Sequence, residues 1–474
     1  MSPPARPLAA LSGLSFRGGA SSFDAGEALS TARGARLDEV GVAQLLTLGH
    51  LMGSRALVKG ASRSMPPGSY AAHGRDAISD FDTWAADLES ALLRELSGYL
   101  EGKRSALLLL SGGLDSRILA GLVKRLQEDG RSRQSVLAAT WGVEQSRDVQ
   151  YARRIAQIYG WEWRHEIMSA DVLAENLDTV LSIGAEVAAH HLHAMPRLTR
   201  DLRGQIDVVL AASYGNSVAQ GDYSGRGLMA LKPLWDDRWR RLGLFKSSFR
   251  SAVEADIHAD AADFGGSPAS SDVPWSRHEL EQQHHCKRRM LSGAMSVLEA
   301  LAPVRQLFTS PDVYGRIWRL DAHERDDRLY RFLLPRLPGR IHEIPWAWTG
   351  RPFGAPGPPL DGFSSDHHDY GGWLRKNLAP AIRREILEGP GSRLSCFVPG
   401  QIERLLNVWS RARTRTVSLL DEMVSNLYAL SKLMRRLELR MEDDFPSSPS
   451  DALHSRFGGA FQLVRINARN LFRA

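Results

Sequence analysis

Cysteine is scarce in this sequence: among 474 residues only Cys286 and Cys396 occur. Two cysteines allow at most one intrachain disulfide, and a chain of this length can bury enough apolar surface to fold without one. We therefore expect both thiols to be reduced, as they are in cytoplasmic proteins.

Long apolar runs are also missing. No stretch reaches the roughly 18 apolar residues that cross a bilayer, and residues 1–6 lack the continuous apolar run of a signal peptide. The sequence therefore predicts a cytoplasmic protein without a membrane partner.

A concentrated excess of basic residues is absent too. The 60 Lys and Arg are nearly balanced by 54 Asp and Glu, so the net charge of +6 does not suggest a dedicated nucleic-acid binder. Hydrophobic residues make up 43% of the chain and include 12 Trp, which excludes a disordered chain, a collagen and a coiled coil. Because one core stops growing at roughly 250–300 residues, we expect a globular protein of more than one part.

Short apolar runs alternate with helical patterns in the first half of the chain. Strands are expected at 106–110, 135–141 and 207–211, and helices at 42–51, 82–100, 117–123, 149–159 and 171–202. Beyond residue 230 we expect helices alone, notably at 405–409 and 419–437. This alternation predicts an α/β fold, a doubly wound parallel sheet, with a helical C-terminal part.

These patterns divide the chain into four expected parts. Their bounds are 1–36 for a flexible lead-in, 37–230 for the α/β domain with its N-terminal connecting segment, 231–441 for the helical part and 442–474 for a tail. The tail ends in a predicted short helix with Arg465, Arg469 and Arg473 four residues apart, and we favour a solvated face there over a site for an anionic partner.

Six residues connect the strand at 106–110 to its helix: Ser111, Gly112, Gly113, Leu114, Asp115 and Ser116. The N–H groups and dipole of the helix favour an anion there, and the glycines let the backbone approach phosphate oxygens closely. Asp115 would repel a bare phosphate but fits if it binds Mg²⁺. This turn therefore predicts a site for magnesium-bound pyrophosphate. No Gly-x-x-x-x-Gly-Lys-Ser/Thr motif occurs, so γ-phosphate transfer by a P-loop is not supported.

The turn resembles the pyrophosphate-binding motif of the ATP pyrophosphatases. This PP-loop group, with the adenine nucleotide alpha-hydrolase fold, includes asparagine synthetases, GMP synthetases and tRNA-lysidine synthetases. Residues 140–142, 147–152 and Gly160 resemble the second nucleotide-binding unit of the synthetase domain of class B asparagine synthetases. The similarity extends over about residues 40–350.

The resemblance implies ATP and Mg²⁺ as cofactors. It makes Asp115 catalytic and a metal ligand together with Asp148, although Asp148 fits equally well as a helix N-terminal residue stabilised by the dipole. The residues implied around the nucleotide are Leu110, Ser111, Gly112, Gly113, Leu114, Ser116, Trp141, Ser213 and Tyr214, with Leu110 and Trp141 beside the adenine. The family's reaction adenylates a carboxylate, releases pyrophosphate and lets ammonia or an amine displace AMP.

The sequence departs from the family at its N-terminus. Members that use glutamine carry a glutaminase domain with a nucleophilic Cys directly after Met, whereas Ser2 stands here and few residues precede the synthetase-like region. We therefore expect no glutaminase activity. The nitrogen would come from free ammonia, a substrate amine or a separate glutaminase.

A second departure concerns the loop after the strand at 207–211. The family has Ser-Gly-Glu-Gly-x-Asp-Glu there, which supplies acidic residues for adenylation and for Mg²⁺, but this chain reads Ala-Ser-Tyr-Gly-Asn-Ser-Val at 212–218. Tyr214 replaces the glutamate and Ser217 the aspartate, or Asn216 does if the register shifts by one. Asp222 is the nearest remaining carboxylate. An uncharged ligand would weaken Mg²⁺ binding and phosphate neutralisation.

Two histidine clusters remain. His190, His191 and His193 lie on a predicted helix, where such close neighbours do not face one another, so a metal site from these three alone is disfavoured against a role as donors to a phosphate or acyl group. His284, His285 and Cys286 lack a second pair at zinc spacing, and we favour surface or core residues of a helix.

The sequence therefore predicts an ATP-dependent, AMP-forming amide ligase that acts on a small-molecule carboxylate and an amine or ammonia. One alternative is a catalytically inactive homologue that binds nucleotide or a partner, which the missing acidic loop favours. Another is a tRNA-modifying enzyme, which would need a basic RNA-binding face.

Overall fold

The computed structural model describes most of the chain. The described residues are 8–11, 13–16, 22–24, 29, 32–65, 76–219, 224–235, 242–264, 274–412, 417–453 and 455–457. The carboxylate Asp222 and the predicted basic helix with Arg465, Arg469 and Arg473 lie outside these residues.

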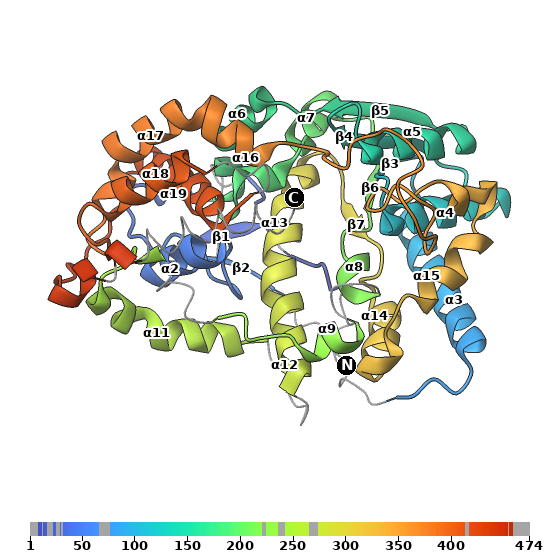
Figure 1. Cartoon of the computed structure of the whole chain (residues 1–474), viewed down its shortest axis with the longest axis horizontal. Coiled ribbons are helices and arrows are strands. Elements are labelled where there is room, and N and C mark those ends of the chain that lie inside the picture. The colour runs from blue at the N-terminus through green and yellow to red at the C-terminus, as the bar shows by residue number, and fades with distance from the viewer. Residues whose placement is uncertain are drawn as a thin grey trace.

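Five parallel strands form the central sheet, in the order β5-β4-β3-β6-β7 (Figure 1). Their bounds are β3 (Ser105–Leu109), β4 (Ser135–Gly142), β5 (Glu162–Ile167), β6 (Val208–Ala211) and β7 (Val304–Gln306). From β3 the chain adds two strands on one side and then two on the other. The strand order therefore reverses between β3 and β6, and in open α/β sheets the carboxyl ends at such a point border the ligand crevice.

Strand β3 is apolar on both faces because both faces of the sheet are covered. Ala106 and Leu108 join one buried cluster, which includes side chains of α3 (Phe81–Leu100), α4 (Leu114–Glu128) and α5 (Arg147–Tyr159). Leu107 and Leu109 join a second cluster, with side chains of α2 (Glu39–Leu48), α6 (Ala170–Thr179) and α19 (Leu419–Leu437). A continuous apolar run is what a strand buried on two sides requires. The predicted doubly wound α/β fold is confirmed.

Six of the helices predicted from the sequence periodicity are present in the structure. The predicted helices are α2 (Glu39–Leu48), α3 (Phe81–Leu100), α4 (Leu114–Glu128), α5 (Arg147–Tyr159), α18 (Gln401–Ser410) and α19 (Leu419–Leu437). The remaining α-helices are α6 (Ala170–Thr179), α7 (Met195–Asp201), α8 (Gly215–Val218), α9 (Gly225–Met229), α11 (Ser247–Ala262), α12 (Pro274–Glu281), α13 (Gly293–Met295), α14 (Pro311–Trp318), α15 (Arg328–Leu333), α16 (Tyr370–Gly372) and α17 (Ala379–Glu388).

Three expectations were wrong. The prediction of helices alone beyond residue 230 fails because β7 completes the sheet from that part of the chain. The single helical region at 171–202 is broken into α6, η2 (Val180–Ile183), η3 (Ala189–Leu192) and α7. The lead-in contains β1 (Leu14–Phe16), which pairs antiparallel with β2 (Ala61–Arg63).

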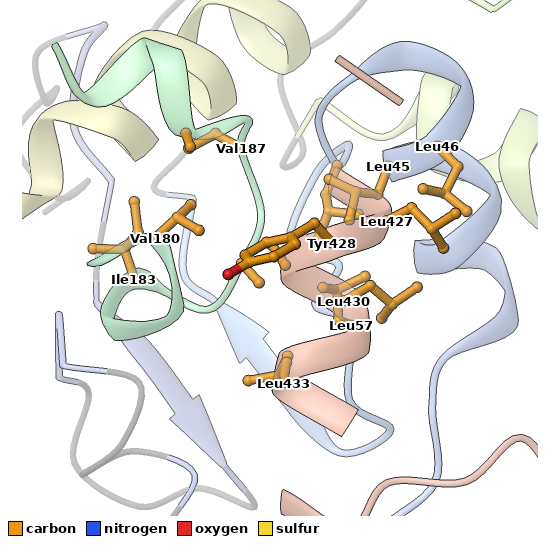
Figure 2. Close-up of a cluster of buried hydrophobic side chains, with 14 of the residues drawn as sticks. Leu45, Leu46, Leu57, Val180, Ile183, Val187, Leu427, Tyr428, Leu430 and Leu433 are labelled. Carbon is orange, nitrogen blue, oxygen red and sulfur yellow. The ribbon is translucent and has the colours of Figure 1, made fainter. Parts of the chain in front are cut away.

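The long helix α19 packs into the body of the protein. Its capping box, formed by Ser418 and Asp421, begins the helix. Figure 2 shows Leu427, Tyr428 and Leu430 among apolar side chains of α2 and η2, all within the larger buried cluster. In Figure 1, α17, α18 and α19 lie at the opposite end of the molecule from α3 and α15.

Among the described helices, none combines the length and the apolar composition needed to cross a membrane.

Candidate nucleotide site

The loop between β3 and α4 is folded by its own hydroxyl groups. The Ser111 and Ser116 Oγ atoms are 2.9 Å apart, the Ser111 N–H donates to Ser116 Oγ at 3.1 Å, and the Gly113 N–H donates to Ser111 Oγ at 3.1 Å. Gly113 is the N-cap of α4 and no side chain caps this helix end. The loop therefore presents the N-terminus of a 15-residue helix and two hydroxyl groups to the space above the sheet.

Gly112 lies where no side chain fits. A Cβ atom there would be 2.9 Å from the Ala347 Cβ and 3.0 Å from the Asp148 Cα. The Gly112 N–H donates to Asp148 Oδ1 at 3.1 Å, so this carboxylate connects the loop to the first turn of α5. Packing at this position therefore requires glycine, and the close approach that glycine permits lets Asp148 contact the loop.

Asp115 lies in the first turn of α4 between two neighbours. The Tyr330 hydroxyl donates to its Oδ1, and burial together with this carboxylate raises the pKa of Tyr330 well above its usual value. On the other side lies Gly215, whose missing Cβ would be 2.5 Å from Asp115 Cγ. The carboxylate is therefore held between α15 and α8.

A cavity of about 320 Å³ lies above the carboxyl ends of β3, β4 and β6. Its lining residues are Leu109, Leu110, Ser111, Gly113, Asp115, Ser116, Trp141, Asp148, His193, Ala211, Ala212, Ser213, Met295 and His367. Most of the residues proposed from the sequence thus share one cavity. Gly112, Leu114 and Tyr214 do not belong to this lining: Gly112 packs against Ala347 and Asp148, and the other two are buried in the core.

One wall of the cavity is aromatic. Trp141 and His193 stack with ring centroids 5.1 Å apart, and His193 Nδ1 lies 2.7 Å from the Tyr370 hydroxyl. Burial lowers the pKa of His193 well below its usual value, so the imidazole is neutral at pH 7. A flat neutral wall of this kind suits the face of a purine ring.

Two residues of the loop after β6, Ser213 and Tyr214, were predicted to bind the nucleotide, and only Ser213 faces the cavity. Ser213 lines it, with its N–H donating to Gln306 Oε1 at 3.0 Å. Tyr214 is fully buried, its hydroxyl lies 2.9 Å from Ser292 Oγ, and burial raises its pKa to about 12. Ser217 is buried as well, whereas Asn216 is exposed. The described part of this loop therefore offers no carboxylate to the cavity.

We call residues 111–116 the phosphate loop, after the ligand that its sequence predicts. Arg117 lies behind this loop and supports it. Its guanidinium is fully buried and donates to the Gly112 carbonyl at 3.2 Å and to the carbonyls of Ile344 and Pro345 at 2.6 and 2.9 Å. Burial lowers its pKa to about 10, so it remains charged at pH 7. This residue fixes the loop to the segment that leads to Ala347.

The charges around the cavity suit a divalent cation with an anion. The described lining contains the carboxylates Asp115 and Asp148, which are ligands that Mg²⁺ prefers, and it contains no Lys or Arg. His367 Nδ1 lies 3.8 Å from Asp148 Oδ2. A polyphosphate in this cavity would meet N–H groups, hydroxyls and a metal held by carboxylates.

Sequence reasoning missed Tyr330, Met295 and His367. Each comes from a segment more than 140 residues away from the phosphate loop, and none carries a local motif. His193 was noted in its cluster without its partner Trp141. The His284, His285 and Cys286 cluster lies in a π-helix, η5 (Gln282–Ser292). There the His285 ring accepts from the Gly53 N–H at 3.0 Å and donates to the Ala261 carbonyl at 3.2 Å, which is the core role favoured from the sequence.

Comparison with known proteins agrees with this geometry. No curated protein gives a significant match to the chain. Residues 87–329, just over half of the 474 residues, match the family described as asparagine synthase. The matched segment contains the five strands of the sheet, the phosphate loop and Asp148. With its parallel sheet and its loop of two glycines between β3 and α4, this chain belongs to the asparagine synthase family.

Proposed function

We propose that the protein is an ATP-dependent ligase that activates a small-molecule carboxylate as an acyl-adenylate and transfers the acyl group to ammonia or an amine. The observation that carries the proposal is the joining of the phosphate loop, Asp115, Asp148 and the Trp141 wall in one cavity. Family membership supports synthetase chemistry with ATP, and the carboxylate and the amine are the finer part of the proposal.

The nucleotide is proposed to lie with its adenine against Leu110 and Trp141 and its phosphates over the loop. The Ser111 and Ser116 hydroxyls and the N–H groups at the start of α4 would bind the β- and γ-phosphates. Asp115 and Asp148 would hold Mg²⁺, which neutralises charge on the departing pyrophosphate.

In the first proposed step, a carboxylate oxygen of the substrate attacks the α-phosphorus of ATP and the bond between the α-phosphorus and the bridging oxygen breaks. Pyrophosphate leaves with that electron pair, toward the loop. In the second step, the nitrogen lone pair attacks the acyl carbon, AMP departs and the nitrogen loses a proton to solvent. The loop lowers the barrier because its donors are fixed before charge develops on the leaving group.

The nitrogen donor is proposed to be free ammonia, a substrate amine or ammonia from a separate glutaminase. Hydrolysis of glutamine by this chain is not part of the proposal. A cytoplasmic location, where ATP is abundant, completes the proposal.

The test is pyrophosphate release from ATP and Mg²⁺ with a panel of amino acids and sugar acids, with and without ammonium. We expect release with at least one acid, with AMP and not ADP as the nucleotide product. Asp115→Asn should lower the rate more than about 100-fold, equivalent to roughly 2.7 kcal/mol.

Asp129→Asn is the matched control, because Asp129 is an exposed C-cap residue at the other end of the same helix. It should leave the rate unchanged. The inactive-homologue alternative is favoured by the carboxylate-free loop after β6. ATP binding without pyrophosphate release from any acid would support that alternative and overturn the ligase proposal.

A further inference from the structure

A second group of potential metal ligands lies outside the nucleotide cavity. His190 and His191, both in η3, meet Glu422 in the first turn of α19. One donor atom from each of the three residues lies within 4.8 Å of the other two. The sequence argument against a metal site considered the histidines alone, whereas the third donor comes from a helix more than 200 residues away.

The distances between the Glu422 carboxylate and the two imidazoles suit three ligands of one metal ion and are too long for hydrogen bonds. Glu422 Oε1 is 3.5 Å from His191 Nε2 and 3.9 Å from His190 Nε2, and neither distance is a good hydrogen bond. Ligand atoms around a tetrahedral zinc ion, each about 2.0–2.1 Å from the metal, are separated by roughly 3.3 Å. The His190 and His191 rings have centroids 4.2 Å apart, so both imidazoles face the same region.

His190 is a buried imidazole with one unpartnered ring nitrogen. Its side chain is 6% exposed, and its buried Nδ1 has no hydrogen-bond partner among the described residues. Its other ring nitrogen, Nε2, lies 3.9 Å from Glu422 Oε1, so this is the nitrogen that faces the carboxylate. Imidazole nitrogen is a common ligand of Zn²⁺.

The surrounding backbone holds the three side chains in place. The Ala189 N–H donates to Ser425 Oγ at 3.1 Å, which joins η3 to α19 directly. Glu422 lies over Gly49, where a Cβ would be 2.9 Å from its Oε2. The side chains of His191 and Glu422 are 20% and 25% exposed, so an ion has access from solvent.

We propose that His190, His191 and Glu422 bind a divalent first-row transition metal, Zn²⁺ being the best fit to two imidazoles and a carboxylate. Water completes the coordination. The metal joins α19 to η3, which ends one residue before His193 in the aromatic wall of the cavity. This structural role is independent of the proposed ligase activity.

Cobalt and zinc binding test the proposal in the full chain, purified without a histidine tag. We expect one Co²⁺ per chain, visible as d–d absorption, and its displacement by one equivalent of Zn²⁺. Glu422→Gln and His191→Ala should each weaken Co²⁺ binding at least ten-fold. Zinc should raise the unfolding temperature of the wild type by several degrees, because it binds only the folded chain.

Two variants separate this site from others. Asp148→Asn alters the nucleotide cavity and should retain Co²⁺ binding, and His323→Ala removes an exposed histidine that contacts Asp321 and should do the same. Glu422→Gln changes little in shape, so its unfolding temperature without metal reports whether it folds. Failure of the wild type to bind Co²⁺ saturably, or equal binding by the folded Glu422→Gln variant, would overturn the proposal whatever the outcome for pyrophosphate release.

Discussion

Two loops at adjacent strand ends have different chemical content. The loop after β3 carries two hydroxyls and a carboxylate into the cavity, with their hydrogen bonds in place. The loop after β6 lies directly beside it, with Gly215 against Asp115, yet it turns Tyr214 and Ser217 into the core. The two loops are thus in contact although the described part of the second loop brings no carboxylate to the cavity.

This difference between the loops indicates that the backbone of the second loop and an acidic side chain on it would serve two separate purposes. Gly215 is needed for packing against Asp115, whereas a carboxylate on the same loop would serve the metal or the adenylation step. Of the described residues in these two loops, only those after β3 bring a carboxylate to the cavity, so nucleotide binding at this site should depend mainly on that loop. Four substitutions test this view of the two loops.

The largest effect is expected from Gly112→Ala in the first loop. The new Cβ would press on Ala347 and on the backbone of Asp148, and the backbone of Asp148 cannot move without shifting α5. ATP affinity should fall more than 100-fold, about 3 kcal/mol, in a titration of bound nucleotide. Gly362→Ala is the matched control, because Gly362 is exposed and an added Cβ there would have open space. Equal losses in both variants would contradict the packing argument.

Ser217→Asp tests whether the second loop can regain its acid. Ser217 Oγ donates to the Tyr214 carbonyl at 3.2 Å and faces Gln283 Oε1 at 3.4 Å, so a carboxylate there would be buried against two acceptors. The free energy of unfolding should fall by about 2–3 kcal/mol, measured by chemical denaturation. Asn216→Asp, at an exposed position, should leave stability nearly unchanged. A stable Ser217→Asp variant would show that the loop re-forms around a new charge.

Gly215→Ala tests the contact between the loops. Its Cβ would lie 2.6 Å from Asp115 Oδ1, so the carboxylate must move. The rate of pyrophosphate release should fall about 30-fold, or roughly 2 kcal/mol, while ATP affinity changes little. Gly98→Ala, in α3 with open space around the added methyl group, is the control for a general glycine effect. An unchanged rate would mean that the position of Asp115 is unimportant.

The smallest effect concerns pH and the aromatic wall. The pKa of His193 is well below its usual value, whereas in the unfolded chain it titrates near 6.5. Between these values the unfolded state binds more protons, so stability falls as pH drops below about 6.5. His193→Asn should make this slope shallower by up to about 1.4 kcal/mol per pH unit, measured by denaturation between pH 5 and 7. His258→Asn, on the exposed side of α11, should not change it.

Short-range signals explain what the sequence could predict. The β3 run, the glycine turn and α4 are contiguous, so their pattern alone placed Ser111, Asp115 and Ser116 in one loop. β5 escaped prediction because Glu162–Ile167 is an edge strand with polar side chains, and β7 because it has only three residues. His367 and Tyr330 reach the site through tertiary packing. Nothing in the residues next to them indicates a ligand.

The buried guanidinium of Arg117 has an electrostatic consequence for the whole site. Its acceptors in the described structure are backbone carbonyls, so no contacting carboxylate cancels its charge. A cation sealed behind the phosphate loop contributes a positive potential there, against the negative charges of Asp115 and Asp148, without occupying the cavity. Mobile ions cannot approach it, and screening by salt is therefore weak. Attraction of a polyphosphate to this loop should persist at ionic strengths that abolish attraction to surface lysines.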